Sequence, residues 1–142
     1  MKAVTRYVGE RRFDSGTGLA RVVMDASRDA GGLGEAPSPK QMVLYGLAGC
    51  TGVDVVVMLE RQKIVFEDFE VEVEAEQTRT HPRVFKTLQI RFRVAADPAN
   101  RDKIKRAIQL SEERFCGVSA MLGKTAEITW ELDLRPLGEP GR

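Results

Sequence analysis

Two cysteines, Cys50 and Cys116, carry the most reactive side chains of this chain. A thiolate can attack an electrophile, ligate a metal or form a disulfide, whereas a protonated thiol in an apolar core is inert. Cys50 lies in a Gly-Cys-Thr-Gly run, and Asp54 follows four residues later, which places both on one face of a helix. Cysteine is among the most buried residue types, so two inert core thiols are the alternative that these residues leave open.

The two thiols have different predicted surroundings. A carboxylate at Asp54 disfavours a thiolate at Cys50 by charge repulsion, so a reactive Cys50 requires a basic partner or another partner for Asp54. Cys116 lies in Phe115-Cys116-Gly117, where the helical pattern breaks. If Cys116 opens a short helix, the free amides and the positive end of the helix dipole favour its thiolate.

His81 is the only histidine, and it precedes Pro82 in a segment, residues 78–83, that is typical of a turn. A Cys–His nucleophile pair would require His81 to fold back onto a cysteine. A metal site needs several His, Cys or carboxylate ligands at suitable spacing, and the sequence reveals no such cluster, so we expect no metal and no cofactor. Phosphate-binding glycine motifs and G-x-S-x-G are absent from the sequence, which argues against nucleotide and serine-hydrolase chemistry.

The segment around Cys50 predicts a long helix. Ser38, Pro39 and Gln41 have the spacing of a capping box with proline at the first helical position. Residues 42–59 are apolar nearly all the way round, which predicts a helix buried on most faces. Glycines in this helix cost up to about 1 kcal/mol each relative to alanine, and close approach of another backbone or helix would offset that cost. These glycines are Gly46, Gly49 and Gly52.

The chain beyond this helix predicts strands with two further helices. Residues 69–76 and 88–94 alternate apolar with charged side chains, which predicts an antiparallel hairpin with glutamates facing arginines. Asp97 caps a second helix, whose inner stripe includes Ser111 and whose outer face includes Glu112 and Glu113. A short helix over residues 118–122 and a last strand over residues 128–134 follow.

The first 37 residues predict three more strands, at residues 3–8, 13–19 and 21–25, and a loop at residues 27–37. Residues 136–142 are predicted to form a loose tail. Runs of strands with segregated helices are typical of the α+β class.

The composition excludes several classes of function. The chain has 142 residues, 42% of them hydrophobic, and a formal net charge of +1, which predicts one domain over residues 1–142 and no nucleic-acid partner. No stretch approaches the roughly 18 apolar residues of a membrane span, and no signal peptide is recognisable, so we expect no membrane partner and a cytoplasmic location. Two distant cysteines are not the disulfide framework of a secreted protein.

Three segments carry a resemblance to a known family. They are Pro37–Met42, which opens the long helix, Leu47–Val56 around Cys50, and Leu110–Ser119 around Cys116. With them, the chain resembles the OsmC/Ohr family of organic hydroperoxide reductases. The resemblance implies antiparallel sheets around a long buried central helix, in an intertwined homodimer.

The resemblance also implies a reaction. Cys50 would be the peroxidatic thiolate that attacks an organic hydroperoxide and becomes a sulfenic acid. Cys116 would resolve it by forming a disulfide, and an external thiol or dithiol would reduce that disulfide. The alternative is an OsmC-like dimer without peroxidase activity, which binds a small apolar ligand or is structural.

One departure from the family's pattern concerns the activation of Cys50. Better-studied branches have a glutamate ten residues before the first cysteine, where it orients a catalytic arginine. Lys40 occupies that position here. The family's arginine comes from the N-terminal strand region, where this chain has Arg11 and Arg12.

Overall fold

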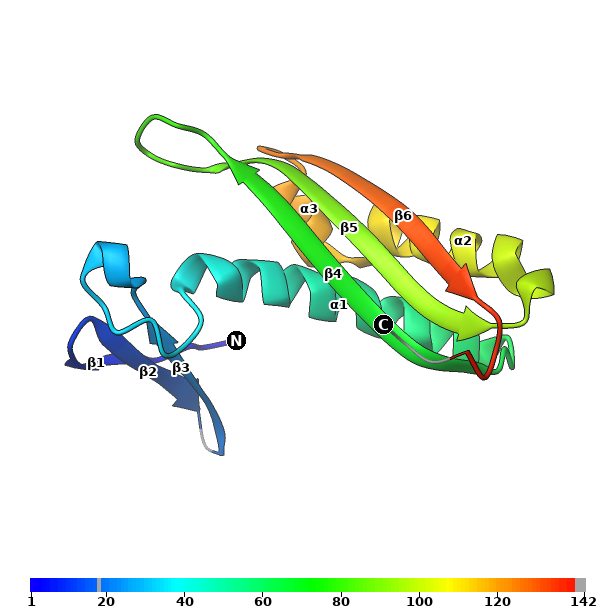
Figure 1. The fold of residues 1–142 in the computed structure, drawn as a ribbon, viewed down its shortest axis with the longest axis horizontal. Coiled ribbons are helices and arrows are strands. Elements are labelled where there is room, and N and C mark those ends of the chain that lie inside the picture. Colours follow the sequence, from blue (N-terminus) through cyan, green and yellow to red (C-terminus); the bar gives the residue numbers. More distant parts are fainter. Residues whose placement is uncertain (18, 140–142) are drawn as a thin grey trace. The chain divides into compact units, whose positions relative to one another are not determined.

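The computed structural model describes residues 1–17 and 19–139 (Figure 1). Its contacts divide the chain into two compact units, Met1–Val43 and Leu44–Arg142, each with its own sheet. The single domain over residues 1–142 stays a prediction. Residue 18 of the predicted strand 13–19 and residues 140–142 of the predicted tail lie outside the described part.

The first unit contains an antiparallel sheet of the three predicted strands. They are β1 (Thr5–Gly9), β2 (Arg12–Thr17) and β3 (Ala20–Asp25), in that spatial order. The predicted loop that follows contains one short 3-10 turn, η1 (Arg28–Ala30).

The long helix α1 (Pro39–Arg61) begins as the capping-box pattern predicts. The backbone N–H of Ser38 donates to Oε1 of Gln41 at 2.8 Å, and the backbone N–H of Gln41 donates to Oγ of Ser38 at 3.3 Å. These two bonds satisfy amides that a helix start otherwise leaves without partners. The local sequence thus fixes the residue at which the helix carrying Cys50 begins.

The remaining elements follow in the predicted order. They are β4 (Phe66–Gln77), β5 (Phe85–Ala96), the 3-10 turn η2 (Pro98–Asn100), α2 (Arg101–Leu110), the π-helical turn η3 (Ser111–Phe115), α3 (Gly117–Leu122) and β6 (Glu127–Arg135). The Asp97 side chain accepts from the backbone N–H of Ala99 at 2.9 Å, as its predicted capping role requires.

The second sheet has the order β4-β5-β6, and it is mixed. The antiparallel pairing of β4 with β5 confirms the predicted hairpin. The last strand corrects the prediction of purely antiparallel sheets, because β6 runs parallel to β5. Parallel neighbours need a long crossover, and the segment with α2, η3 and α3 supplies it by returning the chain to the other end of the sheet.

The predicted charge pairing across the hairpin is confirmed. Glu70 lies opposite Arg93 and Glu72 opposite Arg91. Arg93 pairs with both glutamates, and Arg91 pairs with Glu72 at 3.4 Å and with Glu131 of β6. Each cross-strand pair contributes roughly 0.2–1 kcal/mol. This charged ladder is therefore a stabilising surface of the sheet.

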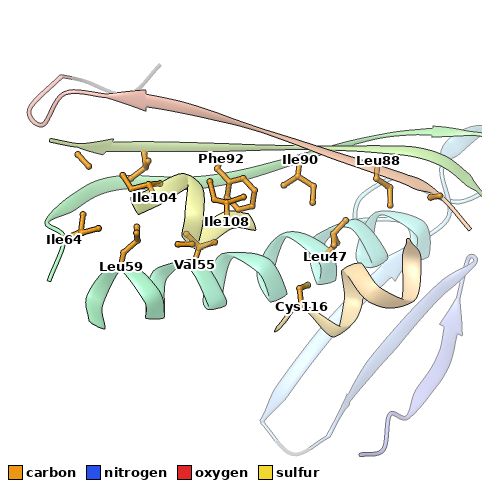
Figure 2. Close-up of a cluster of buried hydrophobic side chains, with 14 residues drawn as sticks. Leu47, Val55, Leu59, Ile64, Leu88, Ile90, Phe92, Ile104, Ile108 and Cys116 are labelled. Carbon is orange, nitrogen blue, oxygen red and sulfur yellow. The ribbon is translucent and has the colours of Figure 1, made fainter. Parts of the chain in front are cut away.

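The hydrophobic core lies between one face of this sheet and the helices (Figure 2). Leu47, Val55 and Leu59 of α1 point toward the sheet, and Ile104 and Ile108 of α2 lie in the same cluster. From β5, the core takes fully buried side chains in alternation: Leu88, Ile90, Phe92 and Val94. The core fixes α1 and α2 against the same sheet.

The expectation that α1 is buried on most faces is wrong within this chain. Its buried residues form one stripe: Leu47, Thr51, Gly52, Val55 and Leu59. On other faces Tyr45 is 56% exposed and Val53 is 64% exposed. Apart from its chain neighbours and the nearby backbone of its own helix, a β-carbon built at Gly46 or Gly49 would meet no described atom within 4 Å, whereas one at Gly52 would lie 3.4 Å from Val71. The predicted close approach therefore holds only at Gly52.

The expectation that no segment approaches the length of a membrane span is wrong for helix α1. An 18-residue window of this helix has a mean hydropathy of 1.9, so by length and composition it could cross a membrane. Core helices of globular proteins meet the same criterion, and the stripe of α1 that contains Leu47 and Val55 packs on the sheet.

Candidate active site

Helix α1 places Cys50 beside the buried stripe. Leu47, Thr51 and Val55 are fully buried, and Cys50 is half-buried and packs against the core cluster. The structure describes both cysteines as free thiols. Cys50 is therefore held by packing while part of its side chain remains open.

A π-helical turn and a helix cap position Cys116. After η3 the backbone of Cys116 becomes extended, and Cys116 is the N-cap residue of α3, as the predicted helix break suggested. The backbone N–H of Ser119 donates to Sγ of Cys116 at 3.4 Å. Cys116 is only 2% exposed and belongs to the core cluster (Figure 2). Burial raises the pKa of this thiol, against the lowering effect of its hydrogen bonds from Ser119.

The fold brings the two thiols and one carboxylate together. Sγ of Cys50, Sγ of Cys116 and a carboxylate oxygen of Asp54 all lie within 4.8 Å of one another. We call this set the thiol–carboxylate cluster. A disulfide requires the two sulfurs to approach from within 4.8 Å to about 2.05 Å. The sequence placed these residues on two helices, and the tertiary structure makes them neighbours.

A buried polar network borders the cluster. Oγ of Ser111 donates to Oδ2 of Asp54 at 3.0 Å and lies 3.0 Å from Oγ1 of Thr51. Oγ1 of Thr51 donates to one carboxylate oxygen of Glu112 at 2.7 Å, and Oγ of Ser119 donates to the other at 2.8 Å. The network joins α1, η3 and α3, so it holds the elements that carry the two cysteines in a fixed relation.

Comparison with known proteins places this architecture in a family. The sequence model described as OsmC-like protein matches residues 32–131. Protein YhfA of Escherichia coli K12 is 36% identical over 95 residues, which are 67% of this chain and 71% of that protein. The chain belongs to the OsmC-like protein family.

Solved structures share the fold of this OsmC-like protein. An OsmC-like protein from Mycoplasma pneumoniae superposes with a TM-score of 0.80 at 14% identity, covering 94% of this chain and 96% of the other. A protein from Legionella pneumophila, described as an organic hydroperoxide resistance protein OsmC, superposes with a TM-score of 0.68 at 21% identity. That match covers 94% of this chain and 97% of the other. Family membership together with two neighbouring cysteines is compatible with peroxidase chemistry.

Sequence reasoning missed the polar network of this OsmC-like protein. The sequence predicts Ser111 on the inner stripe of the second helix, and Thr51 lies on the inner stripe of α1. Two hydroxyls that face one core are therefore the signal for this network. The helical period predicts Glu112 on the outer face, but its carboxylate turns inward and accepts from Thr51 and Ser119. The π-helical turn changes the angular spacing of residues after Leu110, which the ordinary helical period does not predict.

The basic residues considered for activating Cys50 lie in the first unit. Arg11 donates to the backbone carbonyl of Ala30, and Arg12 pairs with Glu35 at 3.4 Å. Asp54 accepts from Ser111, so its carboxylate has a hydroxyl partner. His81 lies exposed in the connection between β4 and β5, as its assignment to a turn predicted.

The buried thiol of Cys116 predicts a pH dependence of stability. Because the pKa is raised in the folded state above the ordinary 9.0, the unfolded chain loses this proton first as pH rises. The contribution is fully present below pH 9.0 and is lost as pH rises through the folded-state pKa. The free energy of unfolding of the reduced protein, measured with urea, should therefore fall more steeply above pH 9.0 in wild type than in Cys116→Ser. Equal pH slopes in the two proteins would contradict the prediction.

Proposed function

We propose that this OsmC-like protein is a thiol-dependent peroxidase that reduces organic hydroperoxides through Cys50 and Cys116. The observation that carries the proposal is the separation of the two sulfurs, which lie within 4.8 Å of each other on separate elements. Two inert core thiols have no need to be neighbours. Two thiols that form and break a disulfide must be.

The first step assigns attack to Cys50. This residue is half-buried, whereas Cys116 is 2% exposed, so a peroxide reaches Cys50 more easily. The Cys50 thiolate attacks the O–O bond of the hydroperoxide and takes one oxygen, forming a sulfenic acid. The other oxygen takes a proton and leaves in the alcohol. Packing of Cys50 against the apolar core cluster favours an organic peroxide over hydrogen peroxide.

The second step assigns resolution to Cys116. Its sulfur attacks the sulfenic sulfur, the Cys50–Cys116 disulfide forms, and the oxygen leaves as water with the thiol proton of Cys116. An external dithiol, or two thiols, then reduces the disulfide and is itself oxidised. Burial raises the pKa of the Cys116 thiol, which favours its protonated and less nucleophilic form.

A homodimer with a cytoplasmic location is part of the proposal. Exposed valines of α1 and side chains of β4 line an apolar groove of about 450 Å³, which includes Gly49, Val53, Val57, Phe69 and Val71. A second copy of the chain packed here would remove this surface from water, a contact that favours association by roughly 25 cal/mol per Å² of apolar area. A mass in solution equal to one chain, measured by light scattering, would contradict the dimer.

Mass spectrometry after peroxide treatment tests the peroxidase. The reduced protein exposed to cumene hydroperoxide should form a Cys50–Cys116 disulfide, recovered as a cross-linked peptide pair. Cys116→Ser should instead accumulate a sulfenic acid on Cys50, trapped with dimedone. A wild-type protein that forms neither product would refute the peroxidase.

The apolar groove also supports a second candidate function. With Lys40 at the position where related peroxidases have glutamate, an OsmC-like protein without peroxidase activity could bind a small apolar ligand in this groove, in place of a second copy of the chain. In that case peroxide would leave both thiols unchanged. A fluorescent apolar probe would bind to the wild-type protein and would bind much more weakly to the Val53→Asp variant. A purely structural dimer would show neither effect.

A further inference from the structure

The thiol–carboxylate cluster has the composition of a metal site. Its three side chains offer two sulfurs and one carboxylate oxygen, all within 4.8 Å of one another. Zinc is bound by cysteine sulfur at about 2.3 Å and by carboxylate oxygen at about 2.0–2.2 Å. Two sulfurs bound to one tetrahedral ion are roughly 3.8 Å apart. The cluster therefore needs only a small contraction to close around an ion.

The charge around the cluster favours a cation. Asp54 belongs to the cluster, and Glu112 lies in the bordering network, where it accepts from Thr51 and Ser119. The hydrogen bonds into the cluster come from the Ser111 hydroxyl and the Ser119 amide. Two thiolates beside a carboxylate repel one another in a half-buried site, and a divalent cation between them removes that repulsion.

The residues next to the cluster hold its ligand atoms in place. Ser111 bonds Oδ2 of Asp54, which leaves the other oxygen of this carboxylate available. The Ser119 backbone N–H fixes Sγ of Cys116. Such outer contacts orient ligands and are typical of metal sites, where their loss costs about 10–100-fold in affinity.

We propose that the reduced protein binds one thiophilic divalent cation, of which zinc is the representative, through Cys50, Cys116 and Asp54. Three protein ligands leave one position of a tetrahedral ion for water, and Cys50 is only half-buried. Binding releases the two thiol protons to solvent and involves no change of oxidation state. The inference uses the cysteine pair of the proposed function but needs no peroxide chemistry. A Cys50–Cys116 disulfide would remove two of the three ligands, so oxidation releases the ion.

Titration of the reduced, metal-free protein tests the site. Zinc added in competition with a chromophoric chelator should bind with one-to-one stoichiometry, and cobalt(II) should give the thiolate-to-cobalt charge-transfer absorption. Cys50→Ser and Asp54→Asn should each weaken zinc binding by about tenfold or more. Asn at position 54 keeps an oxygen for the Ser111 hydroxyl but removes the charge. Glu113→Gln is the matched control, because Glu113 is an exposed carboxylate that bonds Gln109 at 2.7 Å outside the cluster, and its affinity should equal that of wild type.

The outcomes separate the metal site from the peroxidase. Absence of one-to-one binding by wild type, or equal affinity in wild type and Cys50→Ser, overturns the site. Equal affinity in Asp54→Asn also overturns it, because the carboxylate is then no ligand. Treatment with cumene hydroperoxide before titration should abolish binding. Zinc binding that survives this treatment, but is lost in Cys50→Ser and in Asp54→Asn, supports the metal site and contradicts the peroxidase.

Discussion

Replacing Cys50 by serine should reduce the consumption of cumene hydroperoxide to the uncatalysed rate. Serine is close to cysteine in size but is not ionised near neutral pH, so no thiolate remains to attack the O–O bond. Loss of an essential nucleophile costs on the order of 10³-fold or more in rate. Steady-state turnover with a dithiol reductant, followed as loss of peroxide, measures the effect.

The matched control is Cys116→Ser. This variant keeps the attacking thiol and loses the resolving one, so a first equivalent of peroxide should still be consumed rapidly. Subsequent turnover with the dithiol should slow, because a sulfenic acid replaces the disulfide as the species to be reduced. Full turnover by Cys50→Ser would transfer the attack to Cys116 or to another group. If both variants failed equally to consume the first equivalent of peroxide, the separate roles of Cys50 and Cys116 would be contradicted.

Replacing Phe92 by alanine should lower the free energy of unfolding by about 3–5 kcal/mol. Phe92 lies in the central strand β5, is fully buried, and its ring centroid is 6.5 Å from that of Phe69 on β4. Truncation removes the apolar contact with the helices and leaves a cavity that the neighbouring strands β4 and β6 prevent from collapsing. Urea unfolding followed by circular dichroism measures the loss.

Phe115→Ala is the matched control for this truncation. The same atoms are removed from a side chain that is 60% exposed, so the change should stay within about 0.5 kcal/mol. A comparable loss of unfolding free energy in Phe92→Ala and Phe115→Ala would show that burial of the side chain does not decide how much stability is lost. Phe92→Leu, which keeps most of the apolar volume, should recover part of the lost stability.

Local patterns predicted the elements because each depends on residues close together in the chain. The Ser38–Gln41 box produced both of its hydrogen bonds, and the alternation of β4 and β5 produced the Glu72–Arg91 and Glu70–Arg93 pairs. The pairing direction of β6 escaped prediction. An alternating strand has the same pattern in either direction. Only the path of the crossover through α2 and α3 decides that β6 runs parallel to β5.

The same distinction applies to Cys50 and Cys116. By itself, the sequence determined that Cys50 lies on an apolar helix with Asp54 one turn away, that the helical pattern breaks near Cys116, and that both cysteines belong to motifs of one family. Only the tertiary structure decided that the two sulfurs and the Asp54 carboxylate share one cluster, and that Glu112 faces inward beside it. The reason is physical. Hydrogen bonds within a helix turn are set by neighbouring residues, whereas contacts between residues about sixty positions apart exist only after the core between α1, α2 and the sheet has packed.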